Sequence, residues 1–231
     1  WTIKIAAIDF TESNALYTTR GVTPQPGLDF AYIQADSMHL HVSDFYNRAS
    51  EINLPLTLSA HERCGIALRA KGTFAIADSV MSFDNFVIRT AETTLSANGF
   101  LGLGDMTSDP RLPMGLQAEG DISNSDLRMM FPFLSAYLYV LPRNGHLGLE
   151  LDVNGTPSLL DLKRLYLRSN GVIQLQAKGT LSNIFSPYRL GVNLNLSGNI
   201  QRARGLMGAF LPAEIVKQYN IPPMTLGGHV R

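Results

Sequence analysis

Two histidines, His39 and His41, stand two residues apart in the stretch "MHLHV". In a β-strand this spacing places both side chains on one face, an arrangement that can hold a metal ion. Asp36 and Asp44 are nearby in the sequence, yet no recognisable motif supplies a further ligand. We therefore expect no metal site and no cofactor.

Cys64, the single cysteine, precedes Gly65 in the polar stretch "HERCG", so no internal disulfide can form. We expect a structural or incidental thiol. No phosphate-binding loop, dinucleotide fingerprint or nucleophile elbow is present. The remaining histidines are isolated, and we expect them on the surface at strand ends: His61, His146 and His229. These observations indicate that the protein is not an enzyme.

Charge and composition exclude other classes of function. The chain carries 19 basic and 19 acidic residues with no basic stripe, so nucleic-acid binding is not expected. The longest apolar run, "FPFLSAYLYVL" at 131–141, is too short to span a bilayer. The chain has no initiating Met and stops three residues after the last glycine of the pattern below. We expect a piece of a longer protein whose targeting segment lies outside it.

The stretch "IQLQAKGTL" at 173–181 indicates most clearly which kind of secondary structure the chain contains. Ile173, Leu175 and Ala177 alternate with polar residues, which is typical of a strand with one apolar face. Gly179 stands at the next position of this apolar face, two residues after Ala177. Glycine weakens a strand and marks a bend, a bulge or a close approach by another group.

The same strand pattern occurs seven times. Its glycines are Gly72, Gly99, Gly120, Gly155, Gly179, Gly198 and Gly228. Long apolar residues stand four positions earlier: Leu68, Leu95, Leu116, Leu151, Leu175, Leu194 and Met224. Mostly smaller residues stand two positions earlier: Ala70, Ala97, Ala118, Val153, Ala177, Leu196 and Leu226. The position three before each glycine is always polar. One strand type is reused.

A longer period links "MSFDNFVI" at 81–88 with "LDLKRLYL" at 160–167. In both, the apolar alternation changes phase across a polar pair, between Phe83 and Phe86 and between Leu162 and Leu165. Such a change of phase predicts a β-bulge or a sharp bend between two short strands.

These matches define a unit of about 80 residues, made of several strands followed by one short helix. We expect N-terminal strands at 1–58, a first repeat at 59–140, a second at 141–223 and the start of a truncated third at 224–231. Each repeat contains one helical segment, at 121–142 or 199–223. Ser123 or Ser125 is the expected cap of the first helix, and Pro132 is expected to bend or delay it.

A sheet with one apolar face must cover that face. A second layer or the helices could cover it, giving a packed sandwich. Alternatively, the sheet curls into an open trough that accepts a ligand with long hydrocarbon chains. The small residues at and before each glycine allow bending and close approach. On the pattern alone, both alternatives stay open. Either way we expect a mainly β fold.

Three features resemble the TamB branch of the AsmA-like proteins, most closely the versions found in Bacteroidetes envelopes. They are the repeated "LxAxG" strands, the segment "FYNRASEINLPLTLSAHERCGIALRAKGTFAI" at 45–76, and a helix with "AFLP" before a new glycine strand. The resemblance covers nearly the whole chain from Phe30 onward. Residues 1–21 fit as a strand pair that leads into the repeats.

The resemblance implies an elongated, curled β-sheet, a β-taco, in the periplasm of a Gram-negative bacterium, within a parent protein anchored in the inner membrane. Such proteins are thought to carry phospholipids towards the outer membrane through an apolar groove. The branch is also linked to outer-membrane protein assembly with an Omp85-family barrel, contacted through other parts of the parent protein. The chain shows neither the anchor nor a recognisable partner domain.

On this reading the lipid-binding residues are the inner apolar and glycine positions together with the residues at the phase changes. They are Leu68, Ala70, Gly72, Phe83, Phe86, Leu95, Ala97, Gly99, Leu116, Ala118, Gly120, Leu151, Val153, Gly155, Leu162, Leu165, Ile173, Leu175, Ala177, Gly179, Leu194, Leu196 and Gly198. A scaffold for outer-membrane protein assembly remains an alternative function. A packed β-domain of an adhesin, or an enzyme with an unrecognised site, is a further one.

Overall fold

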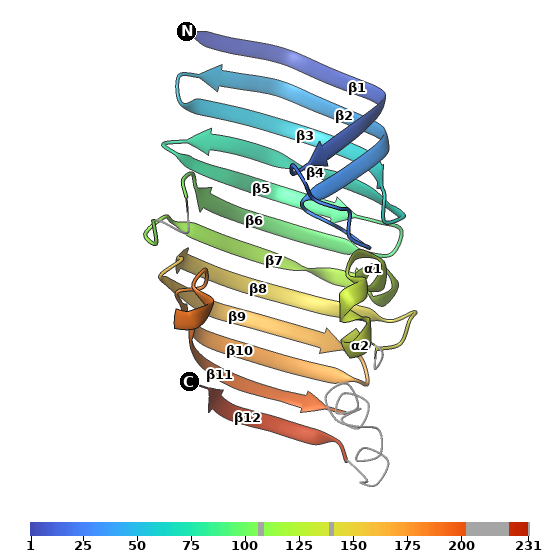
Figure 1. Cartoon of the computed structure of the whole chain (residues 1–231), viewed down its shortest axis with the longest axis vertical. Helices are drawn as coiled ribbons and strands as arrows, with labels where there is room; N and C mark the ends of the chain where they lie inside the picture. The colour runs from blue at the N-terminus through green and yellow to red at the C-terminus, as the bar shows by residue number, and fades with distance from the viewer. Residues whose placement is uncertain (106–108, 139–140, 202–221, 231) are drawn as a thin grey trace.

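The computed structural model describes residues 1–105, 109–138, 141–201 and 222–230. Its twelve strands form one open antiparallel sheet in which each strand pairs with the next along the chain (Figure 1). This confirms the expected mainly β fold with an elongated, curled sheet. The strands are β1 (Thr2–Thr18), β2 (Tyr32–Arg48), β3 (Glu51–Glu62), β4 (Ile66–Ala77), β5 (Val80–Arg89), β6 (Thr94–Gly102), β7 (Met114–Ser123), β8 (His146–Thr156), β9 (Leu159–Ser169), β10 (Ile173–Ser182), β11 (Gly191–Ile200) and β12 (Met224–Val230).

The two faces of this sheet differ sharply in polarity. Directly paired residues of antiparallel strands lie on the same face, so the register traces rows across the sheet. One row from β3 to β12 runs Leu58, Ala70, Ile88, Leu95, Gly120, Leu149, Leu167, Leu175, Gly198, Leu226. The adjacent row runs Ser59, Arg69, Arg89, Thr94, Asp121, Gly148, Arg168, Gln174, Asn199, Thr225. We call the face with the first row the apolar face and the opposite one the polar face.

The two predicted phase changes are β-bulges. In β5 the register with β6 shifts between Phe83 and Phe86, and Asn85 between them has a φ of 51°. In β9 the register with β10 shifts between Leu162 and Leu165. Each bulge turns the strand so that the apolar residues on both of its sides lie on the same face of the sheet.

The strand order is compatible with the predicted repeat. β4 to β7, followed by a helix, match β8 to β11, with the bulged strand second in each set. Gly99 and Gly179 lie opposite the equivalent residues Phe83 and Leu162. The glycines of β4 and β8, the first strand of each set, differ in how they pair with the next strand. Gly72 of β4 lies at the bulge of β5, whereas Gly155 of β8 lies opposite Leu160 of β9. The expected boundary at residue 59 lies within β3, and β4 begins at Ile66. The sheet is continuous across this boundary.

Three short helices follow β7: α1 (Asn124–Met130), the 3₁₀-helix η1 (Pro132–Leu134) and α2 (Ser135–Leu138). Ser123 is the N-cap of α1, and its hydroxyl accepts a hydrogen bond from the N–H of Ser125 at 3.2 Å. α1 ends at Met130, and a separate 3₁₀-helix begins at Pro132, so the proline divides the expected helix instead of bending or delaying it. A further 3₁₀-helix, η2 (Pro187–Arg189), precedes β11. The second expected helix, within 199–223, lies almost entirely outside the described residues.

A buried polar cluster fixes α1 at the end of β7. Asp126 Oδ2 accepts hydrogen bonds from the hydroxyls of Thr90 at 2.6 Å and Thr93 at 2.5 Å, both in the β5–β6 turn. The Asn124 N–H donates to the carbonyl of Gly145, and both Ser123 and Asn124 are fully buried. Buried polar groups need such partners, so this cluster sets where the helix sits.

Apart from the bent ends of β1 and β2 and the short helices after β7, no second layer covers the sheet in the described part of the chain (Figure 1). The apolar residues that are nearly fully buried are few: Val42, Ala60, Ile66, Ala70, Leu141, Leu160, Leu162, Val172, Ala177 and Ile200. The remaining large residues of the apolar face are mostly half-buried. Among the described residues, no helix has the length and apolar character needed to cross a membrane.

Candidate functional site

Every residue of the predicted lipid-binding set lies on the apolar face. The register shows this row by row; for example, Phe86, Ala97, Ala118, Leu151, Leu165, Ala177 and Leu196 are paired in succession from β5 to β11. The set comes from eight consecutive strands, β4 to β11. The structure therefore brings residues 130 positions apart in the sequence into one surface.

The face also includes residues outside the predicted set. β3 contributes Leu54, Leu56 and Leu58, which pair with Phe74, Gly72 and Ala70 of β4. β8 extends the face with Leu147 and Leu149. The alternation in "INLPLTLSA" at 52–60 was the available indication for β3. The predicted set does not include β3, because the set is defined by the glycine of each strand and β3 contains none.

The surroundings of Gly179 explain its place on the apolar face. Its φ is 145°, a backbone conformation that other residues rarely adopt. A Cβ atom there would meet the carbonyl oxygen of Asn193 and lie 3.0 Å from the Cα of Leu194 in β11. Glycine therefore allows the next strand to approach closely, as a tightly curled sheet requires.

Three aromatic rings form a cluster on the apolar face of the first repeat. The ring centroids of Phe74, Phe83 and Phe86 lie 5.2 to 6.4 Å apart, in tilted and edge-on arrangements. The bulged strand of the second repeat carries Leu162 and Leu165 at the positions of Phe83 and Phe86. The lining of the face thus changes from aromatic to aliphatic along the sheet.

The chemistry of this face is solvation. The side chains of the predicted set are all hydrocarbon, and only Ala70, Leu162 and Ala177 among them are nearly fully buried. When a ligand covers half-exposed apolar surface, the binding free energy becomes more favourable by about 25 cal/mol for each Å² removed from water. Such a face can bind hydrocarbon chains without acid–base or metal chemistry.

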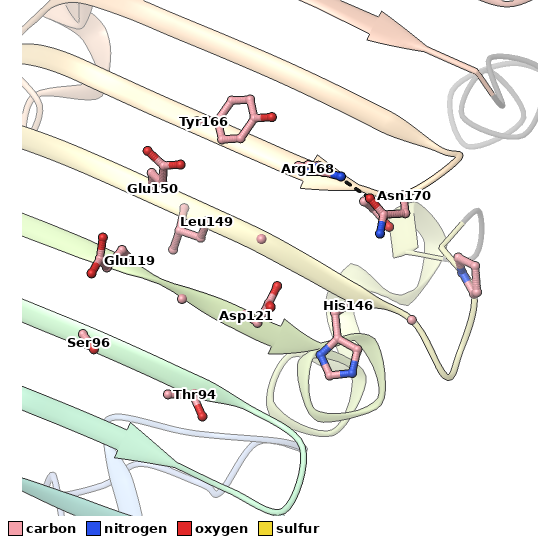
Figure 2. A pocket seen from close by; sticks show the side chains of 15 residues that line it. Thr94, Ser96, Glu119, Asp121, His146, Leu149, Glu150, Tyr166, Arg168 and Asn170 are labelled. Carbon is pink, nitrogen blue, oxygen red and sulfur yellow. Dashed lines mark hydrogen bonds between the residues drawn. The ribbon is translucent and has the colours of Figure 1, made fainter.

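The polar face has its own hollow, of about 870 Å³, over β6 to β9 (Figure 2). Its charged lining consists mainly of Glu119, Asp121, Glu150 and Arg168. Arg168 donates to Asn170 at 3.0 Å, and Glu150 forms an ion pair with Arg164 at 2.6 Å. The hollow is open and its charged groups face water, so it is a poor site for an apolar ligand.

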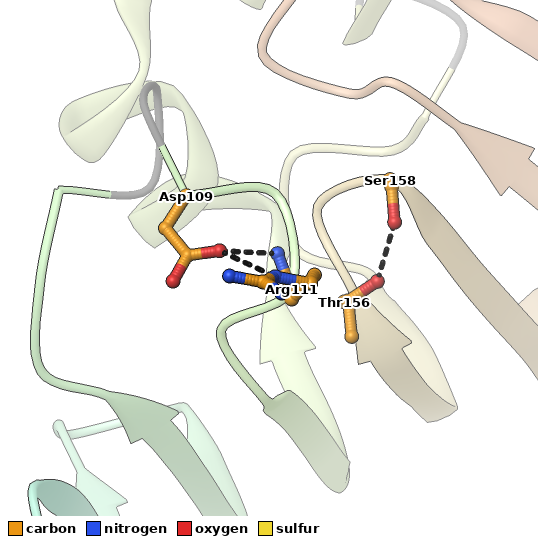
Figure 3. A network of polar contacts seen from close by, with 4 residues as sticks. All are labelled: Asp109, Arg111, Thr156 and Ser158. Carbon is orange, nitrogen blue, oxygen red and sulfur yellow. Dashed lines mark hydrogen bonds and ion pairs between the residues drawn. The ribbon is translucent and has the colours of Figure 1, made fainter.

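A polar contact orders the loop at the opposite ends of the strands (Figure 3). Asp109 accepts from the backbone N–H of Arg111 at 3.0 Å and pairs with its guanidinium at 3.4 Å. That N–H, more than the guanidinium, holds the pKa of Asp109 below its usual value. The N–H of Ser158 donates to the carbonyl of Pro110 at 3.1 Å, which joins this loop to the β8–β9 turn.

The histidines considered as metal ligands each pair with a different carboxylate of β1. His39 lies 3.1 Å from Glu12, and His41 lies 2.7 Å from Asp9. Within the part of the chain that the structure describes, no group of three or more His, Cys, Asp or Glu side chains could hold a metal ion. The pairs join the edge strand to its neighbour, and the absence of a cofactor stays a prediction.

Cys64 is a poor nucleophile at neutral pH. Burial raises the pKa of its thiol to about 11, and the carboxylate of Glu62 adds to the effect. The backbone N–H of Cys64 donates to Glu62 Oε2 at 2.5 Å, so the two residues are in contact. A thiol with this pKa is almost entirely protonated at pH 7.

No protein-family model, curated protein or solved structure matches this chain. The resemblance to the TamB branch therefore depends on the sequence pattern alone.

Proposed function

We propose that the apolar face holds the acyl chains of phospholipids and guides them along the sheet. On this proposal the chain is a periplasmic segment of a TamB/AsmA-like protein that carries lipid between the inner and outer membranes of a Gram-negative bacterium. The observation that carries it is the unbroken row of apolar and glycine residues from β3 to β12, most of which has no second layer over it among the described residues.

The size of the hydrophobic effect supports the proposal. Burying about 16 methylenes at ~0.8 kcal/mol each gives roughly 12 kcal/mol of gross stabilisation. Long residues such as Leu175 and Leu194 supply this contact. Small ones such as Ala177 and Gly179 keep the surface low and let the strands curve.

The dimensions of the sheet suit movement from unit to unit. Neighbouring strands lie about 4.8 Å apart, so a twelve-stranded sheet extends over roughly 50 Å. One acyl chain spans about half of a 30 Å bilayer core, which is the width of about three strands. One acyl chain can therefore contact several successive strands at once. On this proposal the lipid passes from one repeat to the next without entering water.

Site-specific photocrosslinking in living cells, on the full-length parent protein, tests this function. Leu175 and Gln176 are adjacent in β10 and lie on opposite faces, so they form a matched pair. Phospholipid crosslinks at Leu175 alone are the expected result. Protein crosslinks at Gln176 without lipid at Leu175 would favour the assembly scaffold for an Omp85-family barrel. If neither kind of crosslink formed, the result would favour a packed β-domain without a lipid role.

A charge scan in the same strand gives a second test. Leu175→Asp should stop lipid transport while the chain stays folded, because a carboxylate would then stand among the acyl chains. Gln176→Asp should transport normally, because its side chain faces water. Equal transport by both variants would contradict the proposed function.

A further inference from the structure

β1 and β2 bend together near the middle of their length (Figure 1). Glu12 and Ser37 lie at this bend with φ values of 48° and 47°, in the left-handed region that non-glycine residues seldom occupy. The β1–β2 register shifts between Phe10 and Ser13, and the β2–β3 register shifts between Asp36 and His39. Strained backbone at matched positions of paired strands is the kind of place where a hinge forms.

Beyond the bend, residues 13–36 form what we call the hairpin end. It has internal hydrogen bonds, and it also stays bonded to the end of β3, where Ala35 pairs with Glu62 and the Arg63 N–H donates to the carbonyl of Gln34 at 2.9 Å. Asp29 accepts hydrogen bonds from the N–H groups of Gln25 and Ala31, both at 2.9 Å. These two donors hold the pKa of Asp29 below its usual value. The Thr19 N–H donates to the carbonyl of Ala31 at 2.8 Å. The hairpin end is therefore an ordered body, and moving it away from the sheet breaks its bonds to the end of β3.

The tip of the hairpin end reaches α1, which follows it in the sequence by about a hundred residues (Figure 1). The Leu28 N–H donates to the carbonyl of Met130 at 2.8 Å. Arg63 Nη2 donates to the carbonyls of Gln25 at 2.8 Å and Gly27 at 3.1 Å. These contacts close the hairpin end onto the helix and the β3–β4 turn.

The closed hairpin end lies beside a well-buried part of the apolar face. Val42, Ala60, Ile66 and Ala70 of β2 to β4 are all at most 6% exposed. Further along the face a few residues, such as Leu162 and Ala177, are buried to a similar degree, and most large residues are half-exposed. These four residues are therefore shielded from water at this end of the face. The middle of the sheet is open.

One buried group opposes this closure. Glu62 pairs with Ile66 in the β3–β4 register and so lies on the apolar face, with 4% of its surface exposed. Its Oε2 accepts from Cys64, but its Oε1 is buried without a hydrogen-bond partner among the described residues. A buried carboxylate oxygen without a partner disfavours the state that buries it.

We propose that the hairpin end is a lid, hinged at Glu12 and Ser37, that opens and closes over the β2–β4 end of the apolar face. Closure is stabilised by the Leu28–Met130 and Arg63 contacts, and the buried charge of Glu62 keeps it reversible. The movement itself is independent of the proposed function. Its consequence, control of acyl-chain access at this end, rests on that function.

Amide hydrogen exchange on the full chain tests the movement. Residues 13–36 should exchange at least about tenfold faster than β4 and β9, because opening the lid frees them without unfolding the sheet. Exchange as slow as that of β4 would overturn the proposal. Glu62→Gln, which removes the charge and keeps the shape, should slow exchange in the hairpin end. Faster exchange in that variant would contradict the role given to Glu62.

A reversible lock tests the consequence. Leu28→Cys and Met130→Cys, in a Cys64→Ser background, would be joined by a short cleavable thiol crosslinker. A matched control joins Pro110→Cys to Ser158→Cys, a loop contact at the opposite strand ends. The readout is uptake of a pyrene-labelled phospholipid from vesicles of phosphatidylethanolamine and phosphatidylglycerol.

The lid lock should slow uptake at least about tenfold, since access requires an opening that the crosslink forbids, and cleavage should restore it. The control lock should leave uptake unchanged. Equal uptake by both locked proteins would overturn the lid's role in access. If even the uncrosslinked chain takes up no lipid, the proposed function fails, while the exchange experiment still decides whether the lid moves.

Discussion

The ring of Phe86 packs directly on the α-carbon of Gly72 in the neighbouring strand. A methyl group at Gly72 would lie 2.8 Å from Phe86 Cα and 3.0 Å from its Cγ, closer than unbonded carbon atoms approach. The first of these neighbours is backbone, so rotating the ring cannot relieve the contact. The glycine of this strand is therefore required by the aromatic residue at the bulge of the next one.

Gly72→Ala should consequently lower the free energy of unfolding by about 1 to 3 kcal/mol, the usual cost of overpacking a fitted site. Thermal or denaturant unfolding measures it. Gly228→Ala is the control, because a Cβ there would have no atom within 4 Å. That change should stay within about 0.5 kcal/mol of the parent. Equal destabilisation of the two variants would indicate a general effect of replacing glycine and would contradict the steric explanation.

Asp126→Ala should detach α1 from the sheet. The substitution removes the acceptor for the hydroxyl groups of half-buried Thr90 and buried Thr93. Hydrogen bonds to a charged group contribute about 1.5 to 3 kcal/mol each, so a destabilisation of about 2 to 4 kcal/mol is expected. Unfolding measurements, with amide exchange of residues 124–130, check both its size and its place in the fold.

The control for this prediction is Asp121→Ala. Asp121 lies two residues before the N-cap of α1, is exposed on the polar face and makes no hydrogen bond or ion pair among the described residues. Its removal should change stability by less than about 0.5 kcal/mol. Similar destabilisation by both variants would indicate a general effect of removing acidic charge near the helix.

The sheet could be predicted from the sequence because its rules are local. Alternation assigns each residue to a face, and a change of phase such as that between Phe83 and Phe86 has few explanations other than a bulge. The same rule placed every predicted site residue on the apolar face. The register of Gly72 was not predictable, because it depends on which residue of β5 it meets across the bulge.

The lid and the helix anchor depend on long-range contacts that leave no local pattern. Nothing in the sequence marks Glu12 and Ser37 as residues with left-handed backbone, since glycine is the usual indication. The contact of Leu28 with Met130 joins residues about a hundred positions apart. Likewise, Thr93 and Asp126 meet only because β6 and β7 pair.

The thiol of Cys64 should react slowly with alkylating reagents in the folded protein. Its folded-state pKa of about 11 lies about two units above the ordinary value of 9.0, so the thiolate fraction at pH 8 is about 100-fold lower than in the unfolded chain. Iodoacetamide labelling rates with and without guanidinium measure this ratio. The folded chain binds the extra proton between pH 9 and 11, so stability should fall as pH rises through that range.

Glu62→Gln separates the two causes of that shift. Burial, the larger one, remains in the variant, while the repulsion between thiolate and carboxylate is removed. Labelling should therefore become faster than in the parent yet stay slower than in the unfolded chain. Labelling of the parent at the unfolded rate would contradict the partial burial of Cys64 in the β3–β4 turn.

The two repeats carry different side chains at equivalent positions of the apolar face, so one repeat suggests a substitution that the other should accept. Leu165 occupies in β9 the position that Phe86 holds in β5, each directly opposite the alanine that precedes the glycine of the next strand, Ala177 or Ala97. Phe86→Leu therefore introduces a side chain that this backbone already accepts one repeat away. We expect a destabilisation below about 1.5 kcal/mol, as for other hydrophobic exchanges of similar volume.

Phe86→Ala should cost more, about 2 to 4 kcal/mol, because it removes the ring that packs on Phe74, Phe83 and Gly72 and leaves a gap that the sheet fills only in part. If the face binds acyl chains, the alanine variant should also bind lipid more weakly than the leucine variant, because it offers less hydrocarbon surface. The leucine variant should bind a pyrene-labelled phospholipid within about threefold of the parent, since a threefold change is only ~0.6 kcal/mol. A leucine variant as unstable as the alanine variant would mean that the aromatic cluster has a packing role that the aliphatic repeat does not reproduce.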